Sequence, residues 1–143
     1  MKAKLLIAAV ISIGLLLTEL PTLAHHSFAA EFDQNKAITV TGVITKVEWM
    51  NPHMHFYIDV KDESGKVVNW DLETGSPNAL SRRGWTRNAL KAGDIVTVQA
   101  FHAKDGSNLA AARTVTLSDG RKVFAGSVDD GGPGSSSGPA PTR

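Results

Sequence analysis

The sequence predicts a small all-β protein, a barrel of five to six strands with one or two short helices. Strict alternation of apolar and polar residues from His53 to Lys61 is the first reason, because this period of two is typical of a half-buried strand. The second reason is the order of the expected elements, three strands, a helical connection, two strands and a short extra one. The third is the pattern of the first strand.

That first strand is expected from Ile38 to Trp49, and its apolar residues change from one face to the other around Gly42. A glycine at such a change predicts a β-bulge or a sharp bend, because a residue without a Cβ atom can bend where others cannot. A first strand that bends to join two sheets is a mark of small closed barrels.

The remaining elements follow from turn and capping residues. The Asp62–Gly65 turn should join the central strand to a returning strand, and Ser76 should cap a short helix that ends at Gly84, followed by a second helical turn. Trp85 is expected to plug one end of the barrel. The strands expected around this connection are Lys66–Glu73, Asp94–His102, Leu109–Leu117 and Arg121–Ala125. This order is that of the OB-fold, with an SH3-like barrel or an open sandwich as the alternative.

The two ends of the chain differ from the middle. Met1–Ala24 has two lysines, a thirteen-residue largely apolar stretch and a polar end, as in a secretory signal peptide cleaved after Ala24. That stretch is too short for a stable membrane span, which needs about 20 residues. We therefore expect four segments: a signal peptide (1–24), an extended N-terminal arm anchored by Phe28 and Phe32 (25–37), an OB-like barrel (38–126) and a disordered Gly/Ser/Pro tail (127–143).

Charge and composition narrow the function. Cleavage would remove Lys2, Lys4 and Glu19 from the 15 basic and 14 acidic residues, so the mature chain has a formal net charge of zero. A neutral chain lacks the basic surface that nucleic acid requires. The chain has no cysteine, so an exported domain of this kind depends on its core and not on disulfides. The expected location is the periplasm.

Five separated motifs resemble a family of small exported bacterial proteins of unknown function. The resemblance covers His25 to about Gly126 and implies an exported bacterial origin and one compact domain, without an activity to carry over. A looser similarity to periplasmic OB-fold proteins depends on strand order alone. The motifs are His25-His26-Ser27-Phe28, Asn51-Pro52-His53, Gly75-Ser76-Pro77-Asn78-Ala79-Leu80, Arg82-Arg83-Gly84-Trp85-Thr86 and Lys104-Asp105-Gly106-Ser107.

Four of the five histidines form two pairs, His25 with His26 and His53 with His55. Histidines at i and i+2 of a strand share a face, and imidazole binds copper, zinc, iron and nickel. A mature N-terminal histidine would add its amine to its ring nitrogen, similar to the histidine brace of copper proteins. The four histidines are therefore the candidate ligands of copper, or alternatively zinc. Tyr57 and Asp59 share the His53 face, either as groups that orient a ligand histidine or as ordinary exposed strand residues.

No phosphate-binding loop, nucleophile elbow, His-Glu-x-x-His motif or cysteine nucleophile is present. We therefore expect a periplasmic binding module that is not an enzyme and that holds a transition metal. One alternative is a metalloenzyme with a copper brace or a three-histidine zinc centre. The other is a metal-free module that binds an unknown envelope ligand or protein on the barrel face.

Overall fold

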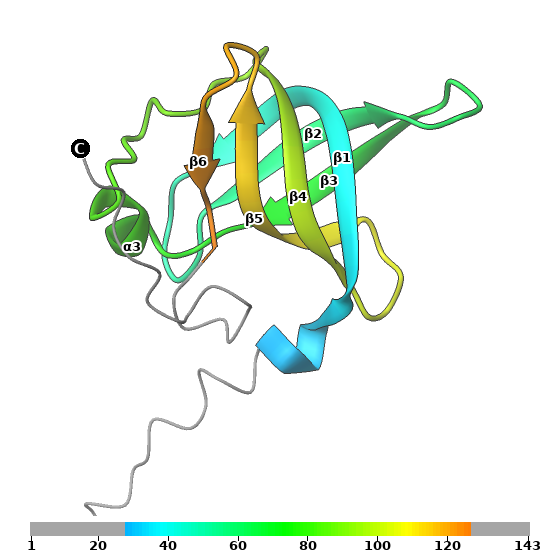
Figure 1. The fold of residues 1–143 in the computed structure, drawn as a ribbon, viewed down its shortest axis with the longest axis horizontal. Helices are drawn as coiled ribbons and strands as arrows, with labels where there is room; N and C mark the ends of the chain where they lie inside the picture. Colours follow the sequence, from blue (N-terminus) through cyan, green and yellow to red (C-terminus); the bar gives the residue numbers. More distant parts are fainter. Residues whose placement is uncertain (1–27, 127–143) are drawn as a thin grey trace, which may run out of the picture.

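The computed structural model describes residues 28–126, and these form six strands with one short helix beside them and a helical turn before the first strand (Figure 1). The predicted signal peptide, the histidine pair at 25 and 26 and the predicted tail lie outside the described residues. The strands are β1 (Phe32–Glu48), β2 (His55–Lys61), β3 (Val67–Glu73), β4 (Ile95–Ala103), β5 (Leu109–Leu117) and β6 (Lys122–Phe124), and the helix α3 (Pro77–Ser81) lies between β3 and β4.

The strands close into a ring. Their order is β3-β2-β1-β4-β5-β6, and a further parallel pairing between β3 and β5 joins the two sides of the sheet. All other pairings are antiparallel. The predicted fold class, a small all-β barrel with short helices, is confirmed.

β1 pairs with strands on both sides of the ring, as predicted, but its first residue and the position of its bulge differ from the prediction. Its first part pairs with β4 and its last part with β2, with Val43 paired to both neighbours. The strand begins at Phe32 and not at Ile38, so the second half of the expected arm is already part of the barrel. Phe32 pairs with Ala103 of β4, which explains the early start.

The predicted bulge at Gly42 is also wrong in position. The register with β2 shifts between Ile44 and Lys46, so the extra residue is Thr45. Gly42 has a different role, because a Cβ atom there would lie 2.4 Å from the carbonyl oxygen of Asp59. The glycine allows two backbones to approach closely, and the bulge follows three residues later.

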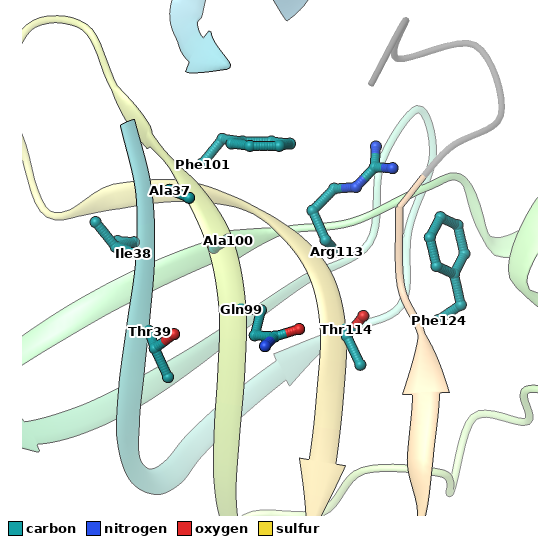
Figure 2. A pocket seen from close by; sticks show the side chains of 9 residues that line it. All are labelled: Ala37, Ile38, Thr39, Gln99, Ala100, Phe101, Arg113, Thr114 and Phe124. Atoms are coloured by element: carbon teal, nitrogen blue, oxygen red, sulfur yellow. The ribbon is translucent and has the colours of Figure 1, made fainter. Parts of the chain in front are cut away.

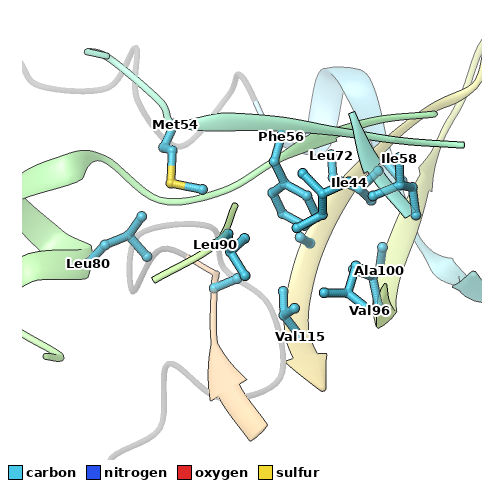
Figure 3. Packing of buried hydrophobic residues seen from close by; sticks show 14 of the residues in the cluster. Ile44, Met54, Phe56, Ile58, Leu72, Leu80, Leu90, Val96, Ala100 and Val115 are labelled. Carbon is cyan, nitrogen blue, oxygen red and sulfur yellow. The ribbon is translucent and has the colours of Figure 1, made fainter. Parts of the chain in front are cut away.

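The main core fills the ring with side chains from every long strand (Figure 3). Phe56, Ile58 and Leu72 have no exposed surface, as alternation along β2 and β3 predicts. Met54, Leu80 and Leu90 extend the core toward the helical connection. Trp85 is buried there, and its Nε1–H donates a hydrogen bond to the carbonyl oxygen of Phe124 (3.1 Å).

A second, smaller apolar cluster lies under the N-terminal part of β1. Phe28 and Phe32 are buried against Phe101, with ring centroids 5.3 Å apart for the first two and 6.2 Å between Phe28 and Phe101. The expectation that Phe28 and Phe32 anchor this segment is confirmed. Residues 28–31 form a helical turn and not an extended arm.

The helical connection agrees with its capping residues. The Ser76 hydroxyl accepts a hydrogen bond from the Ala79 amide (3.3 Å), and Pro77 is the first helical residue. The second expected helical segment, at 87–91, is not a helix and consists of a turn and a bend. No helix within residues 28–126 is long and apolar enough to cross a membrane.

Candidate functional site

The outer surface of β1, β2 and β3 carries a group of polar side chains, called here the histidine face. Alternation turns these residues outward, and the strand register places them in rows. Glu48 pairs with His55, which pairs with Glu73, and Lys46 pairs with Tyr57, which pairs with Asp71. The histidine face consists of Lys46, Glu48, His53, His55, Tyr57, Asp71 and Glu73.

His53 lies just before β2, where the cis peptide bond between Asn51 and Pro52 leads the chain into the strand. Its Nδ1 is 2.9 Å from the carbonyl oxygen of Thr74 and 3.3 Å from Oε1 of Glu73. A carbonyl oxygen only accepts hydrogen bonds, so Nδ1 of His53 must carry a hydrogen. The ring is therefore held in one orientation by the end of β3.

His55 is held by Asp71 of the neighbouring strand. Its Nδ1 is 2.8 Å from Oδ1 of Asp71, and three-quarters of the histidine side chain is buried. The hydrogen bond that His55 donates to Asp71 raises the pKa of His55, against the opposing effect of burial, and the charges of Asp71, Glu73 and Glu48 raise it further. The surrounding carboxylates thus favour a positive charge on this ring.

Both strand histidines use Nδ1 as the donor in their neutral form. The remaining ring nitrogen, Nε2, then carries the lone pair. Metal-binding histidines commonly have this arrangement, with the other N–H donated to a carboxylate or a backbone carbonyl. His55 with Asp71 matches the carboxylate form, and His53 with Thr74 matches the carbonyl form.

Tyr57 belongs to a second hydrogen-bonded group on the same face. Its hydroxyl donates to Oε2 of Glu48 (2.8 Å), and this bond is the main reason that its pKa rises to about 12. Lys46 forms an ion pair with Glu48 and lies over the Tyr57 ring. Hydrogen bonds from Lys46 and then Tyr57 lower the pKa of Glu48. Tyr57 therefore remains protonated and Glu48 ionised near neutral pH.

The side chains considered from the sequence as groups that could orient the histidines, Tyr57 and Asp59, have other hydrogen-bond partners. Tyr57 bonds to Glu48, and Asp59 accepts a hydrogen bond from Asn69 (2.7 Å). Asp71 holds His55 instead, and sequence analysis did not identify it. The signal was present in the Asp62–Gly65 turn, because a hairpin turn sets the register and brings Asp71 diagonally opposite His55.

The four-histidine site is only partly described. His53 and His55 lie on one face, while His25 and His26 fall outside residues 28–126. Within that range, no group of three or more His, Asp and Glu side chains is arranged to hold a metal ion. His102 lies apart from this pair, since its Nε2 bonds to the Ser107 carbonyl of its own hairpin (2.8 Å) and its ring lies tilted against Trp70, with the centroids 5.3 Å apart.

Fold and site together define a small β-barrel with an outward-facing, hydrogen-bonded histidine surface. The chain belongs to a family of unknown function, DUF6152, which it matches over residues 14–112. No curated protein matches the chain. The prediction of a family without known activity is thus confirmed, and β6 lies beyond the matched region.

Proposed function

We propose that the protein is an exported, periplasmic binding module without enzymatic activity, and that it holds a transition metal ion, copper foremost, on the histidine face. The observation that supports this most is the shared arrangement of His53 and His55. Each donates Nδ1–H to an acceptor on β3 or at its end, which leaves Nε2 as the ligand atom.

Two imidazoles are too few for a tight site, and residues 28–126 offer no third ligand in place. The N-terminal histidines would complete the set. Cleavage after Ala24 gives His25 a free amine next to its ring nitrogen, and His26 adds a further imidazole. Copper(II) has the highest affinity among divalent ions for such nitrogen ligands, and zinc is the alternative.

The proposal is tested by calorimetric titration of copper into mature protein that begins at His25. We expect His53→Ala to lower the affinity at least tenfold, which is about 1.4 kcal/mol. Adding one residue before His25 should weaken binding similarly, because it displaces the amine. His102→Ala is the matched control and should leave affinity unchanged, since that ring is bonded within its own hairpin.

Equal affinity in the parent and in His53→Ala would contradict a shared site. Copper would then be bound by the terminus alone, as by a short peptide. Intact-mass measurement of protein from the periplasm checks the cleavage site independently, because a start other than His25 removes the amine ligand.

A further inference from the structure

The N-terminal half of β1 has an edge without a neighbouring strand. β1 pairs with β4 from Ala37 to Val43, and its pairing with β2 begins only at Val43. On the side away from β4, no strand within residues 28–126 lies beside residues 37–41. In Figure 1 the hairpin of β2 and β3 projects away from the body of the barrel instead of following β1. We call residues 37–41 the β1 edge.

The backbone groups of the β1 edge are oriented for pairing with a further strand. The Ile44 amide donates to the carbonyl oxygen of Asp94, directly before β4 (2.9 Å). Residues of an antiparallel strand alternate in the side to which their N–H and C=O groups point, so the even-numbered residues of this half of β1 bond to β4. Ala37, Thr39 and Thr41 then direct their N–H and C=O groups toward the open side.

Charge distinguishes this edge from the other open edge of the barrel. Open edges are commonly protected from unwanted pairing by charged side chains. The open part of β3, residues 67–70, lies on such a protected hairpin, because β3 pairs with β5 only from Asp71 onward. The charged residues of this hairpin are Lys61, Asp62, Glu63 and Lys66. β1, in contrast, has no charged residue from Ala37 to Thr45.

The outer surface next to the β1 edge is neutral as well. Thr39, Gln99 and Thr114 form one row across β1, β4 and β5 by register (Figure 2). Thr41 pairs with Thr97, and their hydroxyl oxygens are 2.9 Å apart. Hydroxyl and amide groups therefore border the edge. A second molecule that approaches with the same surface brings no like charges together along these rows.

The side chains of the β1 edge also match those of a second β1 edge. Ile38 and Val40 pack against the main core but stay partly exposed, as expected of a strand without a neighbour on one side. When two copies pair antiparallel about Thr39, Ile38 of one copy lies opposite Val40 of the other. Such directly opposite β-branched pairs stabilise a sheet, and the pairing covers their exposed apolar surface.

We propose that the protein associates with a second copy of itself through the β1 edge. The two strands run antiparallel with the twofold axis at Thr39, as a symmetric dimer requires. Residues with outward-directed backbone groups then lie opposite one another and form about six hydrogen bonds. A contact confined to this edge buries less than about 1,200 Å², so the dimer is weak, with a dissociation constant on the order of 100 µM.

The test is sedimentation velocity of the mature chain from about 10 µM to about 1 mM, with a chelator present so that no metal ion joins two molecules. Thr39→Lys and Thr39→Glu should each weaken association at least tenfold, because like charges then meet at the twofold axis. An equimolar mixture of the two variants should restore the dimer, since the lysine of one then faces the glutamate of the other. The Thr39 side chain is exposed, so both variants should fold, which melting curves check.

Val67→Lys is the matched control. It adds the same charge at an exposed position of the open part of β3 and should leave association unchanged. Amide hydrogen exchange of the unmodified chain locates the contact independently. The Thr39 and Thr41 amides should exchange more slowly as protein concentration rises, whereas the Val67 and Asn69 amides should not.

Several results would overturn the proposal. If the unmodified chain stays monomeric at about 1 mM, the edge does not pair with its own copy and is left for a strand of another protein. Unchanged association in Thr39→Lys, or a mixture of the two Thr39 variants that stays monomeric, would exclude pairing about Thr39. Equal weakening in Val67→Lys would mean that association follows net charge. If the Thr39 variants fail to fold, amide exchange decides, and protection at Val67 and Asn69 instead would place the contact on β3.

Discussion

The two halves of β1 carry two different surfaces. The half that pairs with β2 borders the histidine face, where charged side chains are bonded to one another across the strands. The half that pairs with β4 borders a hollow, called here the arginine hollow, in which the Arg113 guanidinium group lies near the Phe101 and Phe124 rings (Figure 2). Neutral polar residues of β1, β4 and β5 line it as well. The same strand thus borders both the charged histidine face and the arginine hollow.

The two surfaces position their polar side chains in different ways. On the histidine face, regular alternation and a hairpin register are sufficient to place Asp71 near His55. In the arginine hollow, alternation alone would not bring Arg113 and Thr114 to the same side, and a bulge is needed. Between the two halves lies the segment from Gly42 to the bulge at Thr45, called here the corner, where the partner of β1 changes from β4 to β2.

The largest expected effect comes from breaking that corner. Gly42→Ala would place a Cβ atom 2.4 Å from the Asp59 carbonyl oxygen, so β1 and β2 would have to separate locally. We expect the free energy of unfolding to fall by about 3 kcal/mol, measured by urea denaturation. Gly65→Ala is the control, because its φ of 83° is unfavourable for alanine but the space around it is open. It should cost about 1 kcal/mol, and a cost equal to that of Gly42→Ala would refute the close-approach explanation.

A smaller, pH-dependent effect is expected on the histidine half. Asp71 raises the pKa of His55 in the folded protein. A raised histidine pKa stabilises the fold fully below the unfolded value, near 6.5, and this contribution is lost as pH rises through the folded value. Asp71→Asn should therefore lower the free energy of unfolding of metal-free protein near pH 5.5. The expected loss is about 0.5–1 kcal/mol, because solvent screens the charges of this partly exposed pair. Near pH 8 the loss should largely disappear.

The control for Asp71 is Asp59, a carboxylate on the same outer surface that bonds to Asn69. Asp59→Asn should show no such change between these two pH values. NMR titration of the His55 ring gives a direct reading, since its pKa should fall in Asp71→Asn. An unchanged His55 pKa would mean that Glu73 and Glu48 dominate.

The smallest effect is expected on the other half of β1. Thr41 and Thr97 are paired across β1 and β4, and their hydroxyl oxygens are 2.9 Å apart on the exposed surface. Thr41→Val keeps the β-branched shape and loses a neutral bond that water can replace. The melting temperature should hardly change, and the cost should be below about 0.5 kcal/mol at any pH. If Thr41→Val lowered the free energy of unfolding more than Asp71→Asn does, the expected order of the two halves of β1 would be wrong.

The barrel could be predicted because turns and alternation are local signals. The Asp62–Gly65 turn forms where predicted, and short turns also join β4 to β5 and β5 to β6 between the expected strands. Ser76 caps the helix as expected, because its hydroxyl bonds within its own segment. These features depend on residues only a few positions apart in the chain.

The corner of β1 and the arginine hollow could not be placed in this way. Val43 is exposed although it is apolar, so the change of face seemed to begin at Gly42, and only the pairing with β2 shows that Thr45 is the extra residue. The sequence around Arg113 is compatible with a regular strand. Only the pairing with β4, in which Gln99 lies opposite Thr114 and Ala100 opposite Ala112, shows that Arg113 is an extra residue. Both bulges are defined by two strands together, and a single sequence does not contain that register.

The parallel pairing of β3 with β5 has a consequence for how the ring forms and opens. Three residue pairs make this seam, from Asp71–Leu109 to Glu73–Ala111, and it joins segments far apart in the sequence. Contacts between distant segments require costly loop closure, whereas β1, β2 and β3 pair with their neighbours along the chain. The three consecutive strands β1, β2 and β3 can therefore assemble before the seam closes. The same seam is where we expect the ring to open locally. Asp71 belongs to both the seam and the histidine face, so each such opening would also loosen the hold on His55.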